Sequence, residues 1–232
     1  MKLQNWLPED RPREKLFKQG VEFLSDAELL ALLMGSGIHG VNCVEWARQQ
    51  LTQSGGLLPF FNFTSDKLLN LPGLGKARTA QIIAVREMVT RFVRAKVGTR
   101  TAIRDPTVLA DYLRLSLGNQ TREKFRVFFL NKKLEVLEEK DLFVGTIDET
   151  PVYPREIVKS ALACHATAII LAHNHPSGRL QPSPEDIRVT EKIISACALV
   201  DVRVLDHLIV GREGYFSFCN EGLLKAGGLS HM

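Results

Sequence analysis

A buried strand that runs directly into a cluster of polar side chains constrains this chain more than any other feature of its sequence. Residues 167–172 form a continuous apolar run, which predicts a buried strand, and His173 follows at once. His173 and His175 are two residues apart, so an extended backbone directs both imidazoles to the same side. The next loop leads to Ser183, a natural N-cap, which predicts a helix with Asp186 in its first turn. The order strand, loop, helix therefore predicts that two imidazoles and one carboxylate meet where the strand ends.

This set of side chains is suited to a catalytic metal ion. Two histidines and one carboxylate hold Zn²⁺ with one coordination position left open for water. The ion lowers the pKa of that water toward neutrality and so provides a nucleophile for hydrolysis. The chain has four cysteines, which are widely spaced and include no Cys-x-x-Cys pair, so a zinc ribbon or a disulfide framework is not expected. The pattern favours a hydrolytic zinc site.

The second half of the chain predicts strands interleaved with helices. Residues 124–130 are rich in aromatic and β-branched side chains, and a turn at 131–133 predicts a hairpin. Interleaved strands and helices indicate an α/β domain with a mixed sheet. Strands are predicted at 124–130, 134–138, 142–147, 167–172, 202–210 and 215–218, and helices are predicted from Pro154 to about Cys164 and at 184–199.

The first part of the chain, residues 1 to about 100, predicts helices only. Ser25 and Glu28 form a capping box before an apolar run, and Ser65-Asp66 predicts a further helix start. Residues 96–106 have no apolar periodicity and are the expected linker, so the predicted domains are residues 1–100 and 104–226. Residues 1–100 carry 14 lysines and arginines against 9 acidic residues, whereas the rest carries 16 against 17. This excess is a mild indication that the helical part contacts a polyanion.

A glycine turn in the helical part resembles a helix-hairpin-helix element. Gly73 and Gly75 permit a tight turn that exposes backbone N–H groups, and Lys76 and Arg78 follow. N–H groups at a helix start beside two cations suit a phosphate oxygen, which predicts DNA contact without sequence specificity. The alternative is a helical packing turn that binds nothing.

The spacing of the polar cluster resembles a known family of metalloproteases. His173-x-His175, seven residues, Ser183, two residues and Asp186 match every fixed position of the JAMM (MPN+) signature. The letters His-Asn-His do not indicate an HNH nuclease, because that motif distributes its residues over a ββα-metal unit with different spacing.

A narrower resemblance extends over nearly the whole chain. The run His-Asn-His-Pro-Ser-Gly at 173–178, with Tyr-Pro-Arg-Glu at 153–156 and Leu-Asp-His-Leu-Ile-Val-Gly at 205–211, resembles the bacterial RadC family. The resemblance implies a fold of the α+β or α/β class. In this implied fold, an all-helical helix-hairpin-helix domain is followed by a JAMM/MPN-like (cytidine-deaminase-like) mixed β-sheet domain flanked by helices.

The resemblance also implies roles for individual residues. It implies that His173, His175 and Asp186 bind Zn²⁺ with water as fourth ligand, and that Ser183 hydrogen-bonds the oxyanion or the water. An upstream glutamate acts as general base; the family places it just before the first core strand, which favours Glu123. Two other glutamates remain candidates, Glu149 and Glu156. His207 is either a structural histidine or a member of the site.

Three functions remain open at this point. The first is a zinc-dependent, metallopeptidase-type or isopeptidase-like hydrolase acting on a protein or peptide. The second is a DNA-binding protein of repair or recombination whose metal site is secondary or acts on nucleic acid. The third is a non-catalytic scaffold, although retention of the whole polar cluster argues against it.

The chain lacks an apolar run long enough to span a membrane and has no signal-peptide core, so we expect a cytoplasmic protein without a membrane partner. The physiological substrate and the oligomeric state do not follow from the sequence.

Overall fold

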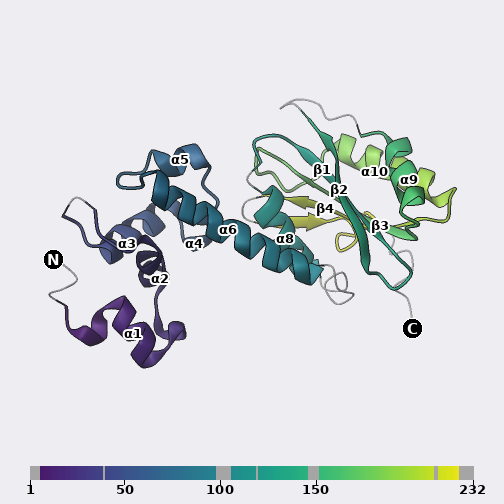
Figure 1. The fold of residues 1–232 in the computed structure, drawn as a ribbon. Helices are drawn as coiled ribbons and strands as arrows, with labels where there is room; N and C mark the ends of the chain where they lie inside the picture. Colours follow the sequence, from purple (N-terminus) through teal and green to yellow (C-terminus); the bar gives the residue numbers. More distant parts are fainter. Residues whose placement is uncertain are drawn as a thin grey trace. The chain divides into compact units, whose positions relative to one another are not determined.

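A computed structural model describes residues 6–38, 40–97, 106–118, 120–145, 152–211 and 214–224 (Figure 1). The chain divides into two compact units, Met1–Met88 and Val89–Met232, and the division falls within the helix α6. Most of the expected linker at 96–106 lies outside the described residues. None of the helices in the described part of the chain combines the length and the apolar character that a membrane span requires.

The regular elements in the described part of the first unit are helices, apart from an isolated β-bridge between Ile38 and Val41. The predicted capping box is present, because the Ser25 hydroxyl accepts from the backbone N–H of Glu28 and the Glu28 carboxylate accepts from the backbone N–H of Ser25. The helix predicted to start at Ser65-Asp66 is capped one residue earlier, by the hydroxyl of Thr64. The elements are η2 (Pro8–Asp10), α1 (Pro12–Gln19), η3 (Val21–Phe23), α2 (Asp26–Met34), α3 (Cys43–Ser54), α4 (Leu57–Phe61), α5 (Ser65–Leu69) and α6 (Lys76–Val97).

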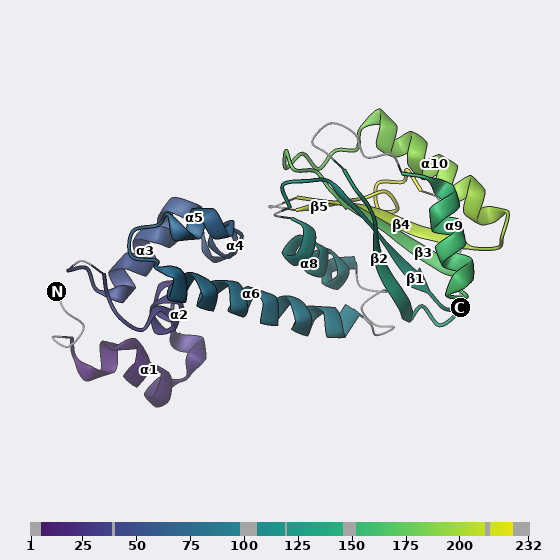
Figure 2. The same ribbon diagram turned by 45° about the horizontal axis from the view of Figure 1, so that its top comes forward.

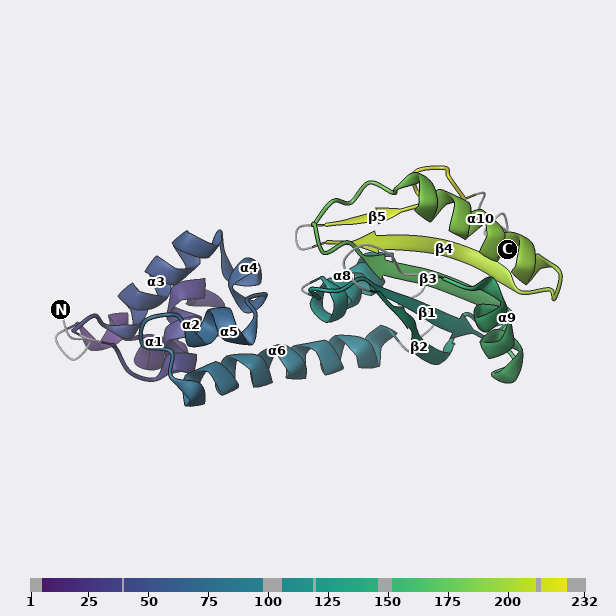
Figure 3. The same ribbon diagram turned by 90° about the horizontal axis from the view of Figure 1, so that it is seen from above.

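The second unit contains a mixed five-stranded sheet in the order β2-β1-β3-β4-β5 (Figure 3). Strand β1 pairs antiparallel with both β2 and β3, β3 and β4 are parallel, and β5 is antiparallel to β4. The elements are α8 (Pro106–Leu117), β1 (Lys124–Leu130), β2 (Val136–Val144), α9 (Pro154–Ala163), β3 (Ala168–Asn174), α10 (Pro184–Ala198), β4 (Arg203–Val210) and β5 (Tyr215–Ser217).

Helices cover both faces of this sheet. Helices α9 and α10 lie on one face, and α8 lies on the other (Figure 2). Side chains of β1 alternate between the two cores: Phe125 and Val127 pack toward α9 and α10, whereas Phe128 packs toward α8. Because β1 and β3 are buried on both faces, apolar residues predominate in both strands, with Arg126 in β1 and His173 and Asn174 at the end of β3 as buried polar exceptions.

The sequence prediction of a third strand at 142–147 was wrong. Residues 142–144 continue β2, which runs unbroken from Val136 to Val144 opposite β1. Two acidic residues in the middle of β2, Glu139 and Asp141, pair with the Arg126 side chain of β1, and Arg126 is only 9% exposed. One oxygen of Glu139 lies 2.7 Å from Arg126 Nη1, and Asp141 accepts from Arg126 Nε at 2.5 Å and Nη2 at 3.1 Å.

Strand β3 extends two residues beyond its predicted end at 172. His173 pairs with Phe125 of β1 and with Ile209 of β4, and Asn174 pairs with Val210. The first histidine of the motif is therefore held by backbone pairing on both sides.

Candidate metal centre

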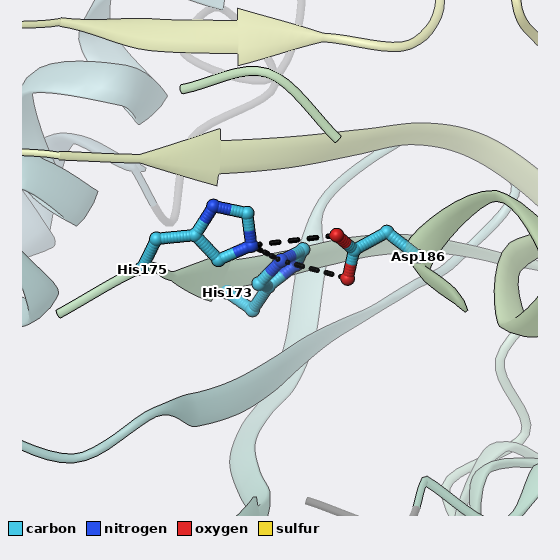
Figure 4. Close-up of side chains that lie close together, drawn as sticks. All are labelled: His173, His175 and Asp186. Atoms are coloured by element: carbon cyan, nitrogen blue, oxygen red, sulfur yellow. Dashed lines mark hydrogen bonds and ion pairs between the residues drawn. The ribbon is translucent and has the colours of Figure 1, made fainter. Parts of the chain in front are cut away.

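Three side chains converge beside the end of β3 (Figure 4). Nε2 of His173 lies 2.9 Å from Nε2 of His175 and 3.2 Å from Oδ1 of Asp186, and Nε2 of His175 lies 3.4 Å from Oδ2 of Asp186. In a tetrahedral zinc site with metal–ligand distances of about 2.0–2.1 Å, ligand atoms are about 3.3 Å apart. Both the donor atoms and their separations therefore fit a zinc-sized ion.

The three residues come from elements that restrict their movement differently. His173 lies within β3 and is fully buried, and its ring stacks on Phe125 with centroids 5.9 Å apart. His175 follows the strand and is partly exposed. Asp186 lies in the first turn of α10 and is 9% exposed. The site is thus rigid on the side of the sheet and reaches solvent on the side of His175.

Asp186 also belongs to a capping box at the start of α10. Its Oδ2 atom accepts from the backbone N–H of Ser183 at 2.7 Å and from the Ser183 hydroxyl at 2.6 Å. In return, Ser183 Oγ accepts from the Asp186 N–H at 3.1 Å. This arrangement leaves Oδ1 facing His173, so Oδ1 is the oxygen best placed to bind a metal. The proton of the Ser183 hydroxyl is used within the cap.

Each histidine has a partner for the ring nitrogen that faces away from the cluster. Nδ1 of His175 lies 2.7 Å from the carbonyl oxygen of Arg179, and a carbonyl can only accept, so His175 carries its proton on Nδ1. Nδ1 of His173 lies 2.8 Å from Nε2 of His207, which is fully buried on β4. In both residues Nε2 is directed at the cluster, as a metal ligand requires.

Asn174, the last residue of β3, forms hydrogen bonds with the segment before β1. The side-chain oxygen of Asn174 accepts from the backbone N–H of Lys124 at 2.9 Å. Its Nδ2 donates to the carbonyl oxygens of Arg122 at 3.1 Å and Gln120 at 3.4 Å. These three bonds bracket Glu123, so the residue between the two histidines fixes the backbone of the candidate general base.

Hydrogen bonds and charges at the site shift the pKa values of Asp186 and His175. Burial opposes the charged form of Asp186, but hydrogen bonds from His173, His175 and Ser183 hold its pKa well below the usual range. Burial lowers the pKa of His175, but hydrogen bonds with Asp186 and the Arg179 carbonyl and the charges of Asp186 and Glu123 outweigh it, and the pKa is raised. The negative charge of Glu123 is one of the contributions that raise the pKa of His175.

The other two candidate glutamates differ in position. Glu156 lies in the first turn of α9, and its carboxylate is 3.5 Å from Nε of Arg155. Glu149 lies outside the described residues.

The residues predicted to contact phosphate lie at the start of α6. Gly73 has φ +84° and its Cα faces the side chain of Ile38, while Lys76 is exposed. An added Cβ at Gly75 would meet no atom within 4 Å.

Arg78 connects the turn before α6 with the segment that follows α2. Its Nη1 donates to the carbonyl of Gly73 at 3.0 Å, and its Nη2 donates to the carbonyl of Ser36 at 3.2 Å and to the Ser36 hydroxyl at 2.5 Å. The guanidinium therefore has partners within the protein.

Sequence reasoning missed two contributors to the site and left a third open. Asn174 was treated only as a spacer in the motif, and Thr190 was not considered. Thr190 follows Asp186 by four residues on a predicted helix, and this spacing places both on one face, a signal that could have identified it. The open residue, His207, contacts His173 directly.

Comparison with known proteins agrees with this architecture. Residues 103–223 match the model of the RadC-like JAB domain, and residues 3–80 match that of the UPF0758 N-terminal domain. A UPF0758 protein of Idiomarina loihiensis is 43% identical over 97% of this chain and 100% of its own length. One from Cellvibrio japonicus has the same identity and coverage, and one from Leptothrix cholodnii is 44% identical over 92% of this chain and 96% of its own.

The fold and the site thus define a RadC-like JAB domain that follows a helical N-terminal domain and contains a His-His-Asp group that could hold a metal ion. The chain belongs to the RadC-like family, and the relatives named above are UPF0758 proteins.

Proposed function

We propose that this protein is a zinc-dependent hydrolase of the metallopeptidase or isopeptidase type. The convergence of Nε2 of His173, Nε2 of His175 and Oδ1 of Asp186 carries the proposal, because three protein ligands with one side toward solvent is the arrangement of a catalytic zinc site. A bound zinc ion supplies an activated water and stabilises negative charge on the carbonyl that is attacked.

The side chains around this cluster have roles that fit hydrolysis of an amide. Glu123, which is held by the Asn174 bonds, takes a proton from the attacking water and delivers it to the leaving amine. Ser183 keeps Asp186 in its rotamer, and its hydroxyl is the candidate hydrogen-bond partner of the developing oxyanion or of the water. The stacked rings of Phe125 and His173 exclude water from the sheet side.

The experiment that tests this proposal compares metal content and hydrolysis. Wild type, the double variant His173→Ala/His175→Ala and Glu123→Gln are purified without added metal and analysed for zinc by plasma mass spectrometry. We expect about one zinc per chain in wild type and in Glu123→Gln, and none in the double variant. The same proteins are then screened against peptide and isopeptide libraries, with and without a chelator.

The outcomes distinguish a zinc hydrolase from a non-catalytic scaffold or a DNA-binding protein. Zinc with chelator-sensitive cleavage in wild type, lost in Glu123→Gln, supports a hydrolase with Glu123 as general base. Zinc in wild type with equal cleavage by Glu123→Gln removes that residue from the mechanism. Absence of zinc in wild type overturns the proposal and favours a non-catalytic scaffold or a DNA-binding protein.

We propose contact with the DNA backbone as a second function, which belongs to the first unit through a helix-hairpin-helix element. Lys76 is exposed at the first position of α6, no acidic residue lies in that turn, and the space around Gly75 is open. A helix N-terminus beside a lysine attracts phosphate. Lys76→Glu should weaken binding to duplex DNA and reduce the salt slope of that binding by about 1. Lys67 is also exposed in this unit, and Lys67→Glu should change the affinity and the salt slope less. Unchanged binding in Lys76→Glu would remove this turn from the interface.

A further inference from the structure

We propose that His207 and Thr190 are positioning residues that hold His173 in the tautomer that binds zinc and connect it to Asp186. The inference rests on the proposed zinc function and adds to it two side chains, His207 from β4 and Thr190 from α10, the helix that also carries Asp186. Neither residue touches the open side of the cluster: His207 is fully buried and Thr190 is 2% exposed.

The direction of each hydrogen bond in this chain of contacts follows from what each atom can do. Thr190 Oγ1 lies 2.5 Å from the backbone carbonyl oxygen of Asp186, which can only accept, so the single hydroxyl proton of Thr190 points there. Thr190 Oγ1 lies 2.7 Å from Nδ1 of His207, and with its own proton used it must accept. Nδ1 of His207 therefore carries a proton.

The tautomer of His173 follows in the same way. A neutral imidazole has one donor and one acceptor, so Nε2 of His207 accepts. The atom 2.8 Å away is Nδ1 of His173, which must donate. Nε2 of His173 is left with a free lone pair, and it is this atom that lies beside His175 and Asp186. The hydrogen bonds thus lead from the backbone carbonyl of Asp186, through Thr190 and His207, to the ring of His173.

Packing holds these rings in place. The ring of His207 stacks on Phe218 with centroids 4.7 Å apart and a 22° tilt, and it meets Phe125 edge-on at 5.5 Å. His173 stacks on the same Phe125 at a tilt of 11°. Because both histidines and Thr190 are buried, water cannot replace a missing partner, and loss of one bond is not compensated.

His173 and His175 differ in the kind of group that contacts their Nδ1 atoms. His175 donates to a backbone carbonyl, which has no alternative state, whereas the partner of His173 is a second imidazole that can exchange its proton between two nitrogens. Without the Thr190 hydroxyl, His207 is free to carry its proton on Nε2 and to donate to Nδ1 of His173. The proton of His173 then moves to Nε2, the atom that the metal needs.

The test measures Zn²⁺ affinity by competition with a chromophoric chelator on the full-length protein. Thr190→Val keeps the volume and removes the hydroxyl, and Thr190→Ser restores it. We expect about 10- to 100-fold weaker binding for Thr190→Val, and binding close to that of wild type for Thr190→Ser. The matched control is Thr79→Val, because Thr79 is also buried but its hydroxyl has no hydrogen-bond partner among the described residues. This control should bind zinc like wild type.

A second variant tests the connection between the two residues. His207→Phe removes both ring nitrogens, and it should weaken zinc binding as much as Thr190→Val or more. Because both act through one chain of contacts, the double variant should be no weaker than His207→Phe alone. In the zinc-loaded protein, long-range ¹H–¹⁵N spectra should show protons on Nδ1 of both His173 and His207.

The outcomes distinguish this inference from the function on which it rests. Zinc binding in Thr190→Val within twofold of wild type, or additive losses in the double variant, overturns the positioning role and leaves the zinc site intact. Absence of zinc binding in wild type overturns both. If Thr190→Val does not fold, the test rests on Thr190→Ser and His207→Phe. Zinc affinity close to that of wild type in His207→Phe rules out the positioning role. Weaker zinc binding in His207→Phe, with wild-type affinity in Thr190→Ser, supports the role.

Discussion

Ser183 donates both its hydroxyl and its backbone N–H to the Oδ2 atom of Asp186, at 2.6 and 2.7 Å. The residue that caps the N-terminus of α10 therefore also fixes the rotamer of a candidate metal ligand. A serine in this position has two separable roles, because orientation of Asp186 affects metal affinity whereas stabilisation of an oxyanion affects only the rate.

Replacement of Ser183 by alanine should affect stability and metal affinity together. Loss of a helix N-cap costs about 1 kcal/mol, and the released Asp186 carboxylate binds zinc more weakly. The control is Ser25→Ala, because Ser25 forms the same capping box with Glu28 in the first unit. Chemical denaturation and zinc competition measure both effects. A variant with wild-type zinc affinity and slow hydrolysis would instead assign Ser183 to the reaction itself.

Replacement of Asn174 by aspartate should loosen the segment that carries Glu123. The carboxylate can still accept from Lys124, but it can no longer donate to the carbonyls of Arg122 and Gln120, which it repels. Hydrogen exchange measured by mass spectrometry should show lost protection at 120–124, while His173 and His175 still bind zinc. Asn131→Asp, at the opposite end of β1, should leave this segment protected, and equal protection in both variants would contradict the role of Asn174.

Zinc affinity should fall as the pH decreases, and the fall should begin above 6.5. The pKa of His175 is raised from 6.5, so the metal-free protein keeps a proton on this imidazole at a higher pH than free histidine does. Zinc binds only the neutral ring and must displace that proton. Glu123 contributes to the upward shift, so Glu123→Gln should move the fall to lower pH. Constant affinity down to a pH well below 6.5 would contradict this prediction.

The two glycines before α6 should differ in their tolerance of a side chain. At Gly73, φ is +84° and an added Cβ would collide with Ile38, so Gly73→Ala should lower the free energy of unfolding by at least about 1–2 kcal/mol. Gly75 has open space around it, and Gly75→Ala should have little effect. Thermal denaturation monitored by circular dichroism compares the two, and equal midpoints would show that this turn adapts.

Much of the sheet could be predicted because burial on two faces leaves a clear pattern in the sequence. Strand β1 has the predicted bounds, Lys124–Leu130, and six of its seven residues are buried. Strand β2 could not be predicted in one piece, because an edge strand accepts charged residues, and Glu139 and Asp141 find their partner only through pairing with Arg126.

The candidate ligands could be predicted because they lie within fourteen residues of one another on a strand–loop–helix unit. His207 is separated from His173 by 34 residues, and its contact depends on the parallel pairing of β3 with β4. Thr190 reaches His207 only because α10 packs on that sheet. The contacts of His207 are set by tertiary packing, which leaves no local pattern in the sequence, whereas the four-residue spacing of Thr190 from Asp186 is visible there.

The placement of Asn174 between His173 and His175 has a consequence for folding. Because side chains alternate along a strand, a slip of β3 by one residue against β1 would turn Asn174 toward Asp186 and both imidazoles toward α8. Such a molecule could retain its helices and much of its sheet, yet it could not assemble three ligand atoms. After refolding, the amount of metal captured per chain therefore counts the molecules whose central strands are correctly aligned, which a spectrum of secondary structure does not reveal.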